Sequence, residues 1–168
     1  MGRYTSCRES MASLTPRFCA SRAVREYTEQ HYLPGAATYR GRAADKGAAG
    51  RQMVDWQHAM EKEWPALRFG EVKVETDGER HTFEVQVYLN DLDPNVVRVE
   101  LYADGVNGDG PVRQEMMRLR QLTGAAGGYV YGGRVAATRP ATDYTARLIP
   151  QHSGVAVPLE ASRILWQR

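Results

Sequence analysis

The acidic, glycine-rich segment from Asp104 to Gly110 comes closest to the composition of a metal-binding loop. A calcium loop of the EF-hand type needs acidic side chains at its first and twelfth positions and glycine at its sixth. If Asp109 and Gly110 are the fifth and sixth positions, the first and twelfth are Gly105 and Met116. Neither residue offers a side-chain oxygen. We therefore expect a hairpin loop here and not a calcium site.

The histidines and the later glycines also have the wrong spacing for a ligand site. The histidines lie far apart, with no second ligand at metal spacing: they are His31, His58, His81 and His152. A dinucleotide-binding loop must leave a strand and enter a helix. No helix is predicted after Gly124, Gly127 and Gly128. Gly132 and Gly133 lie inside a predicted strand and indicate a bulge or a close approach of the backbone.

Tyrosines and carboxylates are the remaining candidates for chemistry. Four tyrosines fall in or beside predicted strands: Tyr88, Tyr102, Tyr129 and Tyr131. They could line a sugar-binding face, but cross-strand packing explains them as well and is the interpretation we favour. No spacing singles out an acid and base pair among Glu84, Glu100, Asp91 and Asp93, which solvated faces and turns explain. We assign no catalytic, cofactor-binding or metal-ligating residue.

Two runs of alternating residues organise the fold. Phe83, Val85, Val87 and Leu89 alternate with polar residues, and Val97, Val99 and Leu101 do so after the turn DLDPN. A period of two places each apolar set on one face of a strand. Pro94 and Asn95 are typical turn residues. The pattern predicts two half-buried strands that pair antiparallel across this turn.

Further short strands follow the same period. We expect them over residues 69–75, 112–122, 129–138 and 142–150, with an edge strand within 155–166. Six or seven short strands with turns at regular intervals predict an immunoglobulin-like antiparallel β-sandwich over residues 67–168. Tyr144 has the placement of a tyrosine corner, which is a packing feature.

Residues 1–66 form a helical segment in our interpretation. After a short polar lead over residues 1–13, Ser21 is the expected N-cap of a first helix, which Pro34 and Gly35 end. Its apolar stripe consists of Val24, Tyr27 and His31. A second helical region over residues 35–65 is weakened by glycines, each by up to ~1 kcal/mol. It carries a stripe that we expect to pack against a neighbouring domain: Met53, Trp56, Met60 and Trp64.

Composition limits the class of protein. The 168 residues are 42% hydrophobic and 25% charged, which is ordinary for a globular chain. A net charge of +2, from 22 basic and 20 acidic residues, makes no electrostatic case for nucleic acid or an anionic membrane. We expect no signal peptide or membrane span. Cys7 and Cys19 are close enough in sequence to form a bridge, but we expect free thiols in a cytoplasmic protein.

The run from Arg8 to Pro34 resembles the segment near the C-terminal end of bacterial α-glucan (glycogen) phosphorylases, in the branch with additional domains. That family has an F-S-x-x-R-x-[VI]-x-E-Y pattern, which here runs from Phe18 to Tyr27. Cys19 stands where the family usually has serine. The later runs WPALRFGEVKVE, DYTARLIP and GVAVPLEASRILW are also similar to the tail of that branch.

The resemblance implies an enzyme family that cleaves the terminal α-1,4 bond of a glucan with phosphate and releases glucose 1-phosphate. The family holds pyridoxal phosphate on a lysine in an E-A-S-G-x-x-x-M-K type motif. In this chain Glu160, Ala161 and Ser162 are followed by Arg163, without the glycine or the lysine. We treat that short match as coincidence and expect no cofactor here. No catalytic residue of the family can be carried over.

We therefore interpret the chain as a C-terminal phosphorylase fragment that packs against a catalytic domain and is inactive alone. One alternative is a stand-alone β-sandwich that binds α-glucan or a protein. Another is a structural module for domain or subunit contacts. Burial of the Met53–Trp64 stripe against the sandwich would favour these two alternatives, and its exposure would favour the fragment.

Overall fold

The computed structural model describes residues 2–106 and 108–168. The chain divides into two compact units, Met1–Arg51 and Gln52–Arg168. We call the first the helical unit and the second the sheet unit. Within the described residues, no helix has the length and apolar character needed to cross a membrane.

The helical unit contains α1 (Gly2–Phe18), α2 (Ala20–Tyr27), the π-helical turn η1 (Thr28–Tyr32) and the beginning of α3 (Leu33–Glu63). Two predicted helix boundaries are wrong, and helix replaces the predicted polar lead from residue 2 onward. The N-cap is Cys19, with extended backbone at φ −72° and ψ 144°, and not Ser21. Pro34 does not end a helix. It follows Leu33 just after the π-helical turn η1, and the helix continues through this point, because the backbone at Leu33 is right-handed helical at φ −67° and ψ −46°.

A break divides α3 into two helical pieces at Ala44–Gly47. Asp45, Lys46 and Gly47 have φ values of 50°, 56° and 77°. Left-handed backbone is costly for residues other than glycine. The glycines of this region predicted a weakened helix, and the break includes one of them, Gly47.

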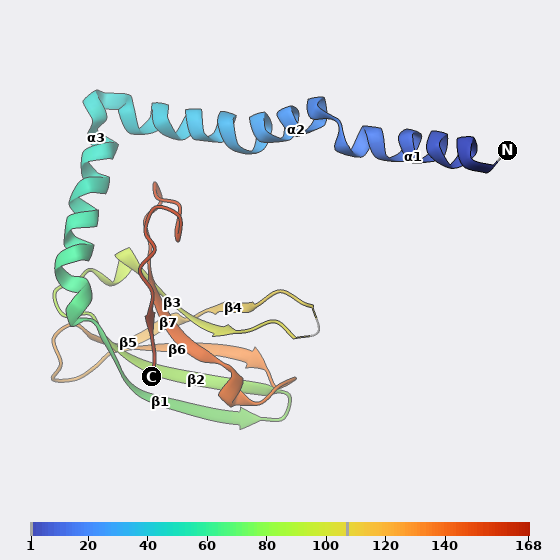
Figure 1. The fold of residues 1–168 in the computed structure, drawn as a ribbon. Coiled ribbons are helices and arrows are strands. Elements are labelled where there is room, and N and C mark those ends of the chain that lie inside the picture. The colour runs from blue at the N-terminus through green and yellow to red at the C-terminus, as the bar shows by residue number, and fades with distance from the viewer. Residues whose placement is uncertain (1, 107) are drawn as a thin grey trace. The chain divides into compact units, whose positions relative to one another are not determined.

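The sheet unit contains two four-stranded antiparallel sheets (Figure 1). Sheet A has the order β1-β2-β6-β5, with bounds Arg68–Asp77, Arg80–Tyr88, Gly128–Ala136 and Met117–Gln121. Sheet B has the order β4-β3-β7-β8, with bounds Val112–Glu115, Val97–Ala103, Thr145–Pro150 and Leu165–Trp166. Short 3-10 turns connect them: η2 (Trp64–Ala66), η3 (Pro94–Val96) and η4 (Ala141–Asp143).

The predicted pairing of the two opening strands is wrong. β2 pairs with β1 and β6, whereas β3 pairs with β4 and β7. The turn after β2 carries the chain from sheet A to sheet B, with Leu89 and Leu92 buried along it. Alternation fixes which face of a strand is apolar, but it does not identify the neighbouring strand.

The single strand predicted over residues 112–122 is also wrong, because Met116 divides it. β4 belongs to sheet B and β5 to sheet A. Met116 is 3% exposed, and its N–H donates to the carbonyl of Val99 at 2.9 Å. One buried residue thus transfers the chain between sheets. The predicted edge strand within 155–166 is reduced to the two residues of β8.

Apolar side chains of both sheets share one core with the last turns of α3. Fully buried members come from β2, β3 and β7: Val85, Val87, Val99, Leu101 and Leu148. Trp56 and Met60 of α3 join the same core at 7% and 3% exposure. Two members of the predicted stripe, Trp56 and Met60, are therefore buried against the sheets of this unit, and Trp64 packs against the same core partly buried. Tyr144 donates to the Ala136 carbonyl at 3.3 Å, the bond expected of a tyrosine corner.

Candidate functional site

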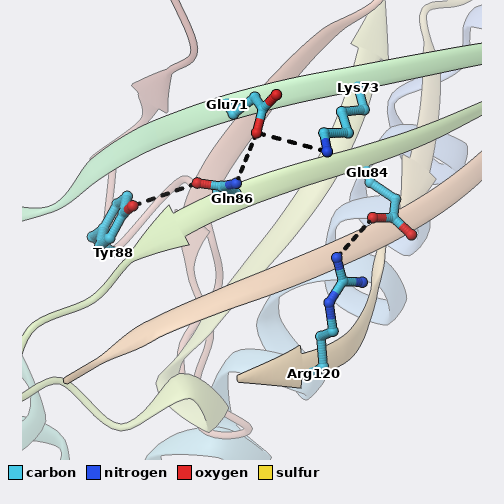
Figure 2. A network of polar contacts seen from close by, with 6 residues as sticks. All are labelled: Glu71, Lys73, Glu84, Gln86, Tyr88 and Arg120. Carbon is cyan, nitrogen blue, oxygen red and sulfur yellow. Dashed lines mark hydrogen bonds and ion pairs between the residues drawn. The ribbon is translucent and has the colours of Figure 1, made fainter. Parts of the chain in front are cut away.

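A polar network covers the outward side of sheet A (Figure 2). We call it the outer polar face and define it by the residues that β1, β2 and β5 contribute: Glu71, Lys73, Glu84, Gln86, Tyr88 and Arg120. The Tyr88 hydroxyl donates to Gln86 Oε1 at 3.4 Å, and Gln86 Nε2 donates to Glu71 Oε2 at 3.1 Å. Lys73 Nζ lies 3.9 Å from the same Glu71 oxygen. These bonds join neighbouring strands through side chains.

The sequence builds this face by simple alternation. Residues 83, 85 and 87 of β2 enter the core, so Glu84, Gln86 and Tyr88 point outward. Lys73 lies opposite Glu84, and a register shift between Phe69 and Val72 places Glu71 beside Gln86. Arg120 Nη2 pairs with Glu84 Oε2 at 3.1 Å.

A glycine makes room for the tyrosine on this face. A Cβ on Gly70 would lie 2.8 Å from Tyr88 Cε2, closer than real contacts allow. The ring also contacts a cation, because the Arg68 guanidinium carbon lies 3.9 Å from its centroid. Tyr88 thus packs against both Gly70 and Arg68. It lies on the side opposite the core.

The outer polar face holds hydrogen-bonding groups in fixed positions. Glu71 accepts from Gln86 and lies near Lys73, and Glu84 pairs with Arg120. These carboxylates are positioned acceptors held by their neighbours. Carboxylate, amide and guanidinium groups are the ones that bind hydroxyls. The face offers such groups in a row across three strands.

A second polar cluster lies on sheet B and was missed at the sequence level. Glu100 is 3% exposed, although we expected its carboxylate to be solvated. Its Oε2 lies 3.3 Å from Arg147 Nη2, and its Oε1 lies 3.6 Å from Arg98 Nη2. The Arg147 guanidinium carbon stands 4.4 Å from the Tyr102 ring centroid and 5.3 Å from that of Trp166. The carboxylate is held by the charge of two arginines, and aromatic rings pack on the nearer one, Arg147.

Register explains the burial of Glu100. It lies opposite Glu115 of β4 and Arg147 of β7, and Arg147 lies opposite Trp166 of β8. The partners come from strands distant in sequence, so no local pattern could reveal the cluster. The one trace of the cluster in the sequence is Arg147 in the run DYTARLIP. It indicates a partner for Glu100 only when β7 is known to pair with β3.

The tyrosines predicted as a set are divided between two faces. Tyr88 and Tyr102 point away from the core, whereas Tyr129 and Tyr131 lie opposite Val87 and Val85, on the core side of sheet A. The hydroxyl of Tyr102 donates to Asp104 Oδ1 at 3.0 Å, which raises the pKa of Tyr102. The set therefore forms no single aromatic surface.

The histidines have structural surroundings. His81 is 6% exposed, and its ring nitrogens lie 2.8 Å from Thr76 Oγ1 and 2.9 Å from the Arg139 carbonyl. The His152 ring stacks near Trp56, with centroids 5.2 Å apart, and His31 lies near Tyr27. His58 is exposed. Within residues 2–106 and 108–168 no group of three histidine, cysteine or acidic side chains is arranged to hold a metal.

The acidic loop and the glycines behave as the sequence predicted. The loop from Asp104 to Gly110 joins the antiparallel pair β3 and β4 and so closes a hairpin; Asn107 lies outside the described residues. Gly132 marks a close approach, because a Cβ there would lie 2.7 Å from Leu119 Cδ1.

Asp93 and the two thiols also match their predicted roles. The carboxylate of Asp93 accepts from the Asn95 N–H at 2.9 Å, as a turn residue should. Cys7 and Cys19 are free thiols.

The short run Glu160, Ala161 and Ser162 lines a cavity of about 440 Å³ beside Trp56 and Met60.

Comparison with known proteins assigns the family. The family model described as the glycogen phosphorylase C-terminal domain matches residues 64–168. A glycogen phosphorylase of Mycobacterium tuberculosis (strain ATCC 25618 / H37Rv) is 31% identical over 168 residues, which cover 91% of this chain and 19% of that protein. A maltodextrin phosphorylase of Thermococcus litoralis is 26% identical over 166 residues, covering 95% of this chain and 20% of the relative. No solved structure matches.

The chain spans about a fifth of the length of these curated relatives. The resemblance stated from the sequence covers the same stretch. The family match begins at the WPALRFGEVKVE run and includes both sheets. The chain therefore belongs to the glycogen phosphorylase C-terminal domain family.

Proposed function

We propose that this chain is the C-terminal part of an α-glucan phosphorylase and that it contributes structure, not catalytic groups, to glucan phosphorolysis. The share of each relative that it covers supports this proposal, at 19% and 20%. The pyridoxal phosphate and phosphate-binding groups would then belong to another region of the enzyme. The full-length enzyme would act in the cytoplasm.

The helical unit carries the observation on which the proposal depends most. No described side chain between residues 7 and 51 is buried. Large apolar side chains along it remain more than half exposed: Phe18, Val24, Tyr27, Tyr32, Leu33 and Tyr39. Helices of this kind gain most of their stability from packing of an apolar face. We infer that these side chains pack against the catalytic domain of a phosphorylase.

For the sheet unit we propose an immunoglobulin-like sandwich that serves as an appended domain. The Tyr144 hydrogen bond and the two sheets around one core support this arrangement. We also propose a domain division into residues 1–66 and 67–168, close to the family match at residue 64. The compact unit begins earlier, at Gln52, because Trp56 and Met60 pack into its core.

The burial of these two residues also bears on the alternatives. A buried stripe is the outcome that favours a stand-alone or structural module, and it makes the sheet unit complete in its own core. The unpartnered surface lies instead in the helical unit. The fragment proposal therefore depends on the exposed residues from Phe18 to Tyr39 and no longer on the Met53–Trp64 stripe.

A phosphorolysis assay tests the proposal. The chain alone should release no glucose 1-phosphate from maltodextrin and phosphate, and turnover above a blank would overturn the proposal. The chain should also bind the separately expressed catalytic region of a phosphorylase of this family. Phe18→Ser with Tyr27→Ser should weaken that binding at least tenfold, since both lie on the proposed interface. Met117→Ser and Leu119→Ser, exposed on β5 of the sheet unit, should have no effect.

A second candidate function is binding of α-glucan by the outer polar face. The ordered row of Tyr88, Gln86 and Glu71 favours it, because sugar hydroxyls can exchange with each of these bonds. Titration calorimetry with maltoheptaose tests it. Binding that Gln86→Ala abolishes and Gln114→Ala leaves unchanged would support this function. Absence of heat would leave the sheet unit as a structural domain.

A further inference from the structure

The two units of the chain differ in charge. The helical unit contains nine arginine and lysine residues and four acidic residues, which gives it a net charge of +5. The sheet unit contains 13 basic and 16 acidic residues, which gives it a net charge of −3. The net charge of +2 of the whole chain conceals this division. An excess of one sign in one part of a chain indicates a partner of the opposite sign.

Three arginines of the helical unit are exposed and have no acidic partner. Arg22 pairs with Glu26 at 2.7 Å. Within the described residues no carboxylate pairs with Arg17, Arg25 or Arg40, and all three residues are exposed. A guanidinium group without an acidic neighbour can bind a carboxylate of another protein through two parallel hydrogen bonds. The three arginines therefore offer binding groups that the chain itself does not use.

These arginines adjoin the exposed apolar side chains of the proposed interface. Each is the sequence neighbour of a large side chain that is more than half exposed: Arg17 of Phe18, Arg25 of Val24 and Arg40 of Tyr39. A partner that covers the apolar side chain also removes water from the arginine beside it. A charge that loses water without gaining a counter-charge is costly. The partner surface must therefore supply carboxylates as well as apolar groups.

The residue types favour a protein as partner over an anionic membrane. Eight of the nine basic residues are arginine, and four tyrosines accompany one phenylalanine, without tryptophan. Arginine and tyrosine are enriched at protein interfaces, where lysine is depleted. A helix on a membrane surface instead buries a continuous face of residues such as tryptophan, phenylalanine and leucine among the lipid chains.

Two glutamates argue against nucleic acid as the partner. Glu26 and Glu29 lie within four residues of Arg25. Nucleic acid presents a continuous row of phosphate charges, which would approach these glutamates as closely as the arginine. A folded protein can place single carboxylates beside the arginine and away from the glutamates.

We propose that the helical unit docks on an acidic protein surface with an apolar centre, whose carboxylates pair with Arg17, Arg25 and Arg40. This inference rests on the proposed function, which locates that surface on the catalytic region of a phosphorylase. It adds the chemistry of the partner surface and a dependence of docking on salt. Exposed charges act over about 10 Å at 0.1 M salt and about 3 Å at 1 M.

Titration calorimetry of the whole chain with the separately expressed catalytic region of a phosphorylase of this family tests the inference, at 50 and 500 mM sodium chloride. We expect Kd to be about tenfold higher at the higher salt. Arg25→Gln with Arg40→Gln should raise Kd about tenfold at 50 mM and much less at 500 mM. Arg113→Gln with Arg134→Gln removes the same charge from exposed positions of the sheet unit and should leave Kd unchanged.

The salt series separates this inference from the proposed function. If Kd is equal at both salts and Arg25→Gln with Arg40→Gln binds normally, docking is apolar and the inference is wrong. Phe18→Ser with Tyr27→Ser would then still weaken binding, and the proposed function would stand. Absence of binding at both salts would overturn the two together.

Other results would also overturn the inference. An equal loss of binding at both salts in Arg25→Gln with Arg40→Gln would indicate altered helix packing and not lost charge. An equal loss in the sheet-unit variant would indicate diffuse attraction by net charge. Tighter binding to phosphatidylserine vesicles or to oligouridylate than to the catalytic region would assign the helical unit to a membrane or to nucleic acid.

Discussion

Similar apolar side chains are exposed in the helical unit and buried in the sheet unit. Leu101 of β3 is completely buried, whereas Leu33 of α3 is 60% exposed. Trp56 and Tyr39 lie on the same helix α3, at 7% and 73% exposure, on either side of the break at Ala44–Gly47. An apolar stripe alone therefore does not make a core. A core forms where segments distant in sequence return to cover the stripe.

The largest difference between the units should appear when a leucine is truncated in each. Leu101→Ala leaves a cavity in a closed core and should lower the free energy of unfolding by about 2–5 kcal/mol. Leu33→Ala should change it by less than about 0.5 kcal/mol, as is usual for exposed sites. Urea unfolding monitored by far-UV circular dichroism, which follows helices and strands together, measures both variants. Equal losses would mean that Leu33 is packed in solution and that the contrast is wrong.

The buried ion pair should show the next largest effect. Arg147→Gln leaves Glu100 buried without its nearer cation, which should cost about 3 kcal/mol. Arg120→Gln breaks the exposed pair with Glu84 and should cost less than about 1 kcal/mol. The same urea titrations provide the values. A double variant with Glu100→Gln and Arg147→Met should recover part of the loss, because no charge then remains buried.

A smaller loss should follow from the tyrosine corner. Tyr144→Phe removes the bond to the Ala136 carbonyl and keeps the ring packing, so we expect a loss of about 1 kcal/mol. Tyr32→Phe, on the exposed helical unit, serves as the matched control and should have no measurable effect. Thermal unfolding monitored by circular dichroism compares the pair. A loss in the control equal to that in Tyr144→Phe would contradict the assignment.

Removal of residues 2–47 should have the smallest effect on the sheet unit. The deletion ends at the left-handed break in α3 and retains the helix that carries Trp56 and Met60. Stability should change by less than about 0.5 kcal/mol. The three tryptophans of the chain, Trp56, Trp64 and Trp166, all lie in the sheet unit, so their fluorescence follows its unfolding alone. A large loss would show that the helical unit stabilises the sheets.

The sequence predicted which face of a strand is buried better than it predicted which strands pair. Phe83, Val85 and Val87 are buried as their alternation indicated, and the acidic loop closes a hairpin. The pairing of β2 with β3 was wrong because both strands direct apolar residues to one core from different sheets. Side-chain period contains no information on which sheet a strand joins.

The polar sites were predicted less well, for a related reason. The outer polar face depends on a register shift between Phe69 and Val72, and the Glu100 cluster depends on the pairing of β3 with β7 and of β7 with β8. Both features arise from pairing between strands. Tyr131 was placed among four similar tyrosines, and only the register of β6 shows that its side chain enters the core.

The order of strands in the two sheets has a consequence for synthesis. β2 cannot pair with β6, nor β3 with β7, until the later strand has been synthesised. Val85 pairs with Tyr131 in the first case, and Val99 with Leu148 in the second. Sheet A can close only after β6 has been synthesised, near residue 136, and sheet B only after β7 and β8, which end at residues 150 and 166. Until then the nascent chain presents unpaired strand edges, a state that chaperones recognise and that favours aggregation.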